Sequence, residues 1–174
     1  MVSWKTGALL VGFTAAMALL AAPASAKDKC VPVPVKGTIT GHFDFSPEPA
    51  WYGKVFLTLG KKGKTVTALL VDRSAGTNEW EDASGNFGGD EVLTFTVEGG
   101  GEIQVSAHFT AIAGEQPFFF WFAETGTITG GTGEYKGAEG TLGIQGSFAA
   151  GYEWSPQYPW LWVAMVNGSV CGVK

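Results

Sequence analysis

Glu124 is the residue whose type and position most directly indicate chemistry. It follows an aromatic run at 118–123 (FFFWFA) and shares a two-residue phase with Phe120 and Phe122. If this segment is a strand, these side chains point to one face, which places a carboxylate in an apolar interior. Burial raises a carboxyl pKa and fits the group for general acid or base work. Glu124 is therefore the candidate catalytic residue. A β-bulge that shifts the phase, or a carboxyl hydrogen-bonded inside a packed core, is the alternative.

Asp72 is a second polar candidate, because it shares the phase of Ala68 and Leu70 at the end of a predicted strand. There it could contact a ligand, and a turn-forming aspartate is the alternative. The segment 72–90 contains five acids whose oxygens could bind calcium, but it lacks the spacing of an EF-hand, so we interpret it as a solvated loop. His42 and His108 lie among polar residues and are expected to face solvent. The sequence therefore predicts no metal site and no cofactor.

Aromatic residues mark the candidate ligand-binding region. Trp51, Trp80 and Trp154 fall in segments between predicted strands, and Phe120 and Phe122 point inward beside Glu124. The tryptophans could line the entrance for an apolar ligand, stack on sugar rings, or pack loops onto the fold.

The elements that must position these residues are strands. Glycine is abundant, with 26 of 174 residues, and it separates short runs rich in β-branched and aromatic residues. Eight such runs occur: 36–45, 54–59, 65–72, 91–98, 102–113, 118–129, 140–149 and 159–171. No segment after residue 26 has a helical period. The pattern predicts an all-β fold, a single eight-stranded antiparallel up-and-down barrel, with a Greek-key sandwich as the rival.

Alternation within the runs predicts which side chains face the interior. The inward set includes Ile39, Phe43, Val55, Leu57, Ala68, Leu70, Leu93, Phe95, Val97, Ile103, Val105, Ala107, Phe109, Phe118, Phe120, Phe122, Leu142, Ile144 and Phe148. The last run is apolar on both faces, so its phase stays open. On this layout the longer, aromatic loops gather at one end of the barrel, where a ligand would enter.

The first 26 residues have the pattern of a secretory signal peptide. Lys5 supplies the positive charge, 7–22 is apolar, and Ala24-Ser25-Ala26 is a small-x-small cleavage site. We therefore predict a secreted or periplasmic protein with an N-terminal segment at 27–35 and a barrel domain at 36–174. The remaining chain has no stretch apolar enough for a transmembrane helix. The net charge of −5, with 16 acidic against 11 basic residues, disfavours nucleic acid as a partner.

The chain has two cysteines, Cys30 and Cys171, near the two ends of the predicted domain. Export exposes them to oxidising conditions, and closure of the barrel brings the first and last strands together. We predict a disulfide between them, worth about 4–5 kcal/mol in the chain-entropy model. A lipid-modified or metal-binding cysteine fits the surrounding residues less well.

The segment 128–146 (ITGGTGEYKGAEGTLGIQG) predicts a tight structural turn. Gly131, Gly133, Gly137 and Gly140 permit close backbone approach, and Tyr135 supplies an aromatic plug. The stretch Gly131-Thr132-Gly133-Glu134-Tyr135-Lys136-Gly137-Ala138-Glu139-Gly140 resembles the glycine-rich turn of the allene oxide cyclase barrel family and its dirigent relatives. The resemblance implies an eight-stranded barrel that steers cyclisation or coupling of hydrophobic substrates without a cofactor, commonly as a homo-oligomer. It carries over no catalytic residue outside the turn.

Three functions follow as hypotheses. The first is an exported barrel that binds a small hydrophobic molecule in its lumen through an aromatic mouth. The second is a cofactor-free cyclase or isomerase resembling allene oxide cyclase, with Glu124 as acid or base. The third is a carbohydrate-binding or structural interaction module. Binding ranks first because the sequence offers one candidate catalytic residue and no assembled catalytic group.

Overall fold

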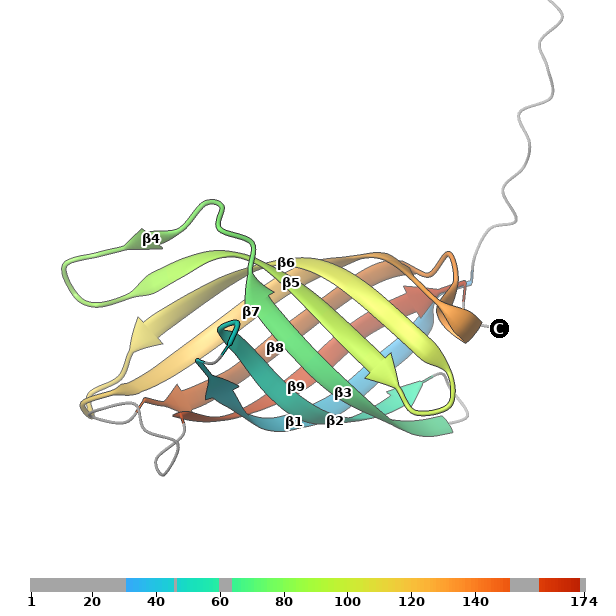
Figure 1. Cartoon of the computed structure of the whole chain (residues 1–174), viewed down its shortest axis with the longest axis horizontal. Coiled ribbons are helices and arrows are strands. Elements are labelled where there is room, and N and C mark those ends of the chain that lie inside the picture. Colours follow the sequence, from blue (N-terminus) through green and yellow to red (C-terminus); the bar gives the residue numbers. More distant parts are fainter. Residues whose placement is uncertain (1–30, 46, 60–63, 151–159, 173–174) are drawn as a thin grey trace, which may run out of the picture.

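The structure is a computed structural model that describes residues 31–45, 47–59, 64–150 and 160–172. Figure 1 shows long antiparallel strands wound into a closed barrel. The strands are β1 (Val33–Asp44), β2 (Ala50–Leu59), β3 (Lys64–Ser74), β4 (Trp80–Glu81), β5 (Phe87–Val97), β6 (Gly101–Ala113), β7 (Phe119–Gly131), β8 (Glu139–Ala149) and β9 (Trp160–Cys171). A single 3-10 turn, η1 (Gly133–Tyr135), joins β7 to β8. Among these described elements, no helix has the length and apolar character needed to cross a membrane.

Closure of the sheet follows from the pairing of its strands. The order β3-β2-β1-β9-β8-β7-β6-β5 places sequence neighbours side by side, and β3 also pairs with β5. The first and last strands meet along their whole length, from Val33 opposite Val170 to Phe43 opposite Trp160. The two-residue β4 pairs only with the start of β5 and extends past the barrel end. The predicted eight-stranded antiparallel barrel is confirmed, and it excludes the Greek-key sandwich.

Alternation along the strands produces the core. Nearly all of the predicted inward side chains are buried or half-buried, with Val55, Leu93 and Phe95 fully enclosed. In β9 the even-numbered residues point inward and the odd-numbered ones outward, which assigns the phase that the sequence left open. Phe118 is the exception: it is 39% exposed and has a φ of 61° in the turn before β7. The prediction that it faces the interior is wrong, because the strand phase starts only at Phe119.

Trp162 packs where two paired glycines leave room for it. Gly41 on β1 and Gly53 on β2 are register partners. A Cβ on Gly41 would lie 2.3 Å from the Trp162 indole nitrogen, and one on Gly53 would lie 3.0 Å from the ring. The indole N–H donates a hydrogen bond of 3.0 Å to the carbonyl oxygen of Tyr52. The glycine pair is therefore what lets the largest side chain lie flat against β1 and β2.

We expect Gly41→Ala to destabilise the fold by about 1–3 kcal/mol, since the added methyl group overpacks the Trp162 contact and strikes the Tyr52 carbonyl oxygen. Urea denaturation measures the change. Gly143→Ala on β8 is the matched control, because its nearest neighbour is the mobile Asn167 side chain at 3.2 Å. Equal stability of the two variants would contradict the packing role of Gly41.

The glycine-rich turn closes the end of the barrel opposite β4. Gly133 has a φ of 58°, and a Cβ there would lie 2.3 Å from the carbonyl oxygen of Gly100 in the neighbouring turn. The Glu134 amide donates to that same oxygen at 2.8 Å. Tyr135 is only 1% exposed and packs against the core. The turn thus places an aromatic ring across the end of the lumen.

The two strands that carry the ends of the barrel domain, β1 and β9, lie side by side. Val33, at the start of β1, pairs with Val170, and Cys171 ends β9. Cys30, the signal-peptide residues and Trp154 lie outside the described residues, so the disulfide and the cleavage site stay predictions.

The disulfide has a direct chemical test. We expect thiol alkylation of the unfolded, non-reduced protein to leave its mass unchanged, and alkylation after reduction to add two labels. Intact-mass spectrometry reads both. Two labels without reductant would contradict the disulfide.

Candidate functional site

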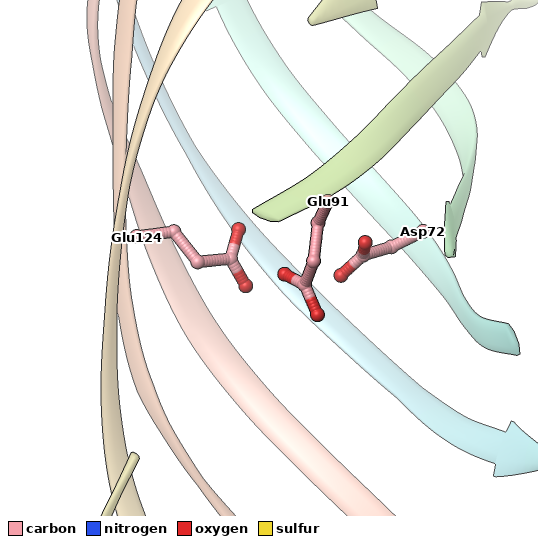
Figure 2. A group of neighbouring side chains, drawn as sticks. All are labelled: Asp72, Glu91 and Glu124. Atoms are coloured by element: carbon pink, nitrogen blue, oxygen red, sulfur yellow. The ribbon is translucent and has the colours of Figure 1, made fainter. Parts of the chain in front are cut away.

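Three acidic side chains from three strands meet inside the barrel near its open end. Asp72 lies on β3, Glu91 on β5 and Glu124 on β7, all on inward-facing positions. Asp72 pairs with Leu93, so Glu91 stands two residues nearer the barrel end on the same face. Figure 2 shows the carboxyl groups pointing toward one another, with Glu91 between the other two. One oxygen from each residue lies within 4.8 Å of the others. We call this group the carboxylate cluster.

The carboxylate cluster is buried with no cationic side chain in the described lining of its cavity. Asp72 is 2% exposed, and Glu91 and Glu124 are each 5% exposed. One oxygen of each carboxyl group, Oδ1 of Asp72 and Oε2 of both glutamates, has no hydrogen-bond partner. Among the described residues, no lysine, arginine or histidine lines the cavity around them. Buried charges are ordinarily paired, so an arrangement of this kind is costly to the fold and points to a use.

Burial raises the pKa of all three carboxyl groups. It raises the pKa of Asp72 from its ordinary 3.8 to about 7 and that of Glu91 from 4.5 to about 9. Repulsion from Asp72 raises the Glu91 pKa further, and burial with repulsion from both neighbours raises the pKa of Glu124 well above 4.5. A side-chain hydrogen bond between Asp72 and Glu91 lowers the Asp72 pKa and raises that of Glu91. The two carboxyl groups thus titrate as a coupled pair, with both pKa values raised by burial.

A small cavity is lined by the three carboxyl groups and by aromatic side chains. Its volume is about 20 Å³, room for one water molecule or one ion. Its aromatic lining is Trp51, Phe87, Phe109, Phe122, Phe148 and Trp162. Below the cluster the lumen is filled, because Leu70, Leu93 and Phe95 are at most 1% exposed. The space that a ligand could enter therefore lies above the cluster, toward the open end.

That open end carries a larger hollow of about 510 Å³, which we call the mouth. It shares five residues with the small cavity: Trp51, Asp72, Phe87, Glu91 and Phe109. The residues around β4, Glu79, Trp80 and Glu81, form part of its wall. Asp72 and Glu91 thus lie at the floor of the mouth and connect it to the cavity.

The structure brings most of the predicted site residues together. Trp51 and Trp80 line the mouth, and Phe122 lines the cavity beside Glu124. Phe120 is half-buried and packs on Phe87 and Phe148, with ring centroids 5.4 Å and 4.8 Å away. Trp154 lies outside the described residues.

Sequence reasoning missed Glu91, although a signal for it was present. Glu91 shares the two-residue phase of Leu93, Phe95 and Val97, so alternation alone places it inside. The predicted strand began at Glu91, whereas β5 begins four residues earlier at Phe87. A residue at a strand end is easily taken for a solvated one.

The remaining acids of the 72–90 loop behave as surface groups. The Asp82 side chain accepts hydrogen bonds from backbone amides of Ser84 and Asn86, and hydrogen bonds with Asn86 lower its pKa. Asp90 contacts Nδ1 of His108 at 2.9 Å, and this contact lowers the Asp90 pKa. Both histidines are exposed. Of the loop acids, Asp72 alone joins the carboxylate cluster.

Fold and site together define a closed eight-stranded antiparallel β-barrel with a carboxylate cluster beneath an aromatic mouth. No protein-family model matches the chain, and comparison with curated proteins and with solved structures found no similar protein. The chemistry open to the site is set by its groups: carboxyl oxygens that can hold protons, hydrogen-bond a ligand or coordinate a cation.

Proposed function

We propose that this protein is an exported barrel that binds a small, mainly apolar molecule in its mouth. The observation that carries the proposal is the mouth itself, a hollow of about 510 Å³ lined by aromatic rings over two carboxyl groups. Small-molecule sites have volumes of about 300–1,000 Å³, with apolar walls and a few polar groups that fix orientation. Trp51, Phe87 and Phe109 supply such walls, and Asp72 and Glu91 supply the polar contacts.

The same lining constrains the charge of the ligand. A ligand whose polar end is an anion would meet Asp72 and Glu91 at the floor and Glu79 and Glu81 on the wall. Like charges in a site with little water repel strongly. The lining therefore disfavours an anionic ligand, whereas a hydroxyl, carbonyl or similar neutral polar group can hydrogen-bond to the cluster.

Export and family membership belong to this proposal. The apolar segment at 7–22 followed by Ala24-Ser25-Ala26 supports a cleaved signal peptide and a secreted or periplasmic location. The eight-stranded barrel and the glycine-rich turn around Tyr135 support a relation to the allene oxide cyclase barrel family.

Binding of an uncharged apolar probe tests the proposal. We expect N-phenyl-1-naphthylamine to bind the purified protein with enhanced fluorescence, and Ser74→Trp, which fills the mouth, to weaken it at least about tenfold. Trp51→Ala, which removes an aromatic wall, is expected to weaken binding as well. Trp121→Ala is the control, since Trp121 is 59% exposed on the outer face. Unchanged affinity in both mouth variants would contradict the proposal.

A second candidate is a cofactor-free cyclase or isomerase, and the convergence of three carboxyl groups on one cavity favours it. Glu124 is positioned to give or take a proton from a substrate seated above it. Native mass spectrometry of the protein from its source can identify a retained ligand, whose conversion is then measured. Full turnover by Glu124→Gln would remove Glu124 from the mechanism and leave the binding function.

A further inference from the structure

We propose that Asp72, Glu91 and Glu124 form a binding site for a divalent cation, and that the cation is calcium. The inference goes beyond ligand binding in the mouth, and beyond the sequence, which predicts no metal site. It assigns a specific occupant to the small cavity at the centre of the carboxylate cluster.

The spacing of the oxygens fits a shared cation. Oxygens bound to one calcium ion at about 2.4 Å are at most about 4.8 Å apart, when they lie on opposite sides of it. The three acids offer one oxygen each within 4.8 Å of one another. Magnesium holds its ligands at about 2.1 Å, so its opposite ligands are about 4.2 Å apart. A spread of up to 4.8 Å can be bridged by one calcium ion.

Unpartnered buried oxygens are a second, separate observation. Asp72 and Glu124 are more than nine-tenths buried, and each has an oxygen without a hydrogen-bond partner beside the cavity of about 20 Å³. Figure 2 shows both carboxyl groups pointing toward that of Glu91, which lies between them. A cation between them would satisfy the orphaned oxygens and supply the positive charge that the described lining lacks.

The donor set and the size of the cavity select among cations. All three ligands are carboxylates, which suit calcium, magnesium and manganese, whereas zinc, copper and nickel favour histidine or cysteine. Both histidines are exposed, and neither lines the cavity. Magnesium keeps several bound waters, but the cavity has room for about one. Three carboxylates that lose their protons on binding and are all bidentate supply six oxygens, the lower end of the six to eight that calcium prefers.

Terbium luminescence and calorimetry test the site on the whole folded protein. Trp51 and Trp162 line the cavity, so tryptophan excitation is expected to sensitise emission from Tb³⁺ bound there. Calcium is expected to bind chelator-treated protein with a Kd below about 1 mM and to displace Tb³⁺. Glu124→Gln and Asp72→Asn, which keep the side-chain shape, are each expected to weaken Ca²⁺ binding at least about tenfold.

A matched control separates the buried site from the acidic surface. Glu98→Gln removes an exposed carboxylate that lines neither the cavity nor the mouth. It is expected to bind Ca²⁺ like the parent protein. Absence of Ca²⁺ binding at 1 mM, or binding lost in Glu98→Gln but kept in Glu124→Gln, would overturn the proposal. Binding of N-phenyl-1-naphthylamine is measured separately in the presence of a chelator. A protein that binds no cation can therefore be distinguished from one whose mouth binds no apolar ligand.

Discussion

The cation-free protein is expected to become less stable as the pH rises from about 4 to about 9. In the folded state the pKa of Asp72 is raised to about 7 and that of Glu91 to about 9, whereas the unfolded groups titrate near 4. The folded state therefore binds more protons across this range, and stability falls as pH rises through the folded pKa values. The other side chains that line the cavity around the cluster are aromatic, so they do not offset this loss of stability.

The size of the effect is large for a small domain. A pKa that moves from 3.8 to about 7 corresponds to roughly 4 kcal/mol at about 1.4 kcal/mol per pH unit, and the coupled groups do not simply add. Urea denaturation at pH 5 and pH 9 in the presence of a chelator measures it. Glu91→Gln is expected to flatten the pH dependence and to unfold at a higher urea concentration than the parent at pH 9.

Two observations would contradict this expectation. One is a stability that rises from pH 5 to pH 9 in chelator, and the other is a Glu91→Gln variant with the slope of the parent. Glu81→Gln, whose carboxylate is exposed, is the control and should keep the parent slope. Asp82 and Asp90 have lowered pKa values, so their stabilising contribution is lost only as the pH falls through the acid range. Stability should therefore peak near pH 4–5, below the usual optimum of about pH 5–8.

Alternation carried most of what the sequence could predict. Ile39, Leu70, Phe95 and Ile144 are each 2% exposed or less, as a two-residue period requires of one face. The same period placed Asp72 and Glu124 on the inner face, where they lie. In a closed barrel the inward-facing side chains of all strands point into the same lumen. Residues of the inward phase are therefore buried.

The encounter of the three acids could not be predicted in the same way. Which inward residues lie at the same depth depends on the stagger between β3, β5 and β7, and that stagger is a property of the closed sheet. Register places Asp72 opposite Leu93 and Glu124 opposite Phe109, which brings distant segments to one level. The alternation of residues within one strand gives no information about the stagger between strands.

Two other features could not be predicted from the sequence of a single strand. Phe118 interrupts its phase because the turn before β7 gives it a positive φ. In β9 both faces are apolar, and Leu161, Val163 and Met165 are each more than half exposed. Hydrophobicity alone cannot distinguish such an outer face from the core, so only pairing with β1 and β8 fixes the inward set.

Trp162→Ala is expected to destabilise the protein by about 3–5 kcal/mol, among the largest losses from any single truncation of this core. Trp162 is 3% exposed, and its ring lies 5.9 Å from Trp51 and 5.8 Å from Phe122 between centroids. Its removal leaves a void over Gly41 and Gly53, which have no side chains to fill it. The loss includes the hydrogen bond to the Tyr52 carbonyl oxygen.

Two further variants separate the void from the hydrogen bond. Trp162→Phe keeps an aromatic ring over the glycine pair and is expected to cost about 1–2 kcal/mol, the size of a lost hydrogen bond with partial packing. Trp121→Ala removes the same side chain from the outer face, where it is 59% exposed, and is expected to cost less than about 1 kcal/mol. Denaturation at pH 5, below the raised pKa values of Asp72 and Glu91, limits charge repulsion in the comparison. Equal losses for Trp162→Ala and Trp121→Ala would show that the glycine pair and the indole do not form a packing unit. A loss confined to Trp162→Ala would show that the buried position of this indole, and not the loss of a tryptophan as such, accounts for the destabilisation.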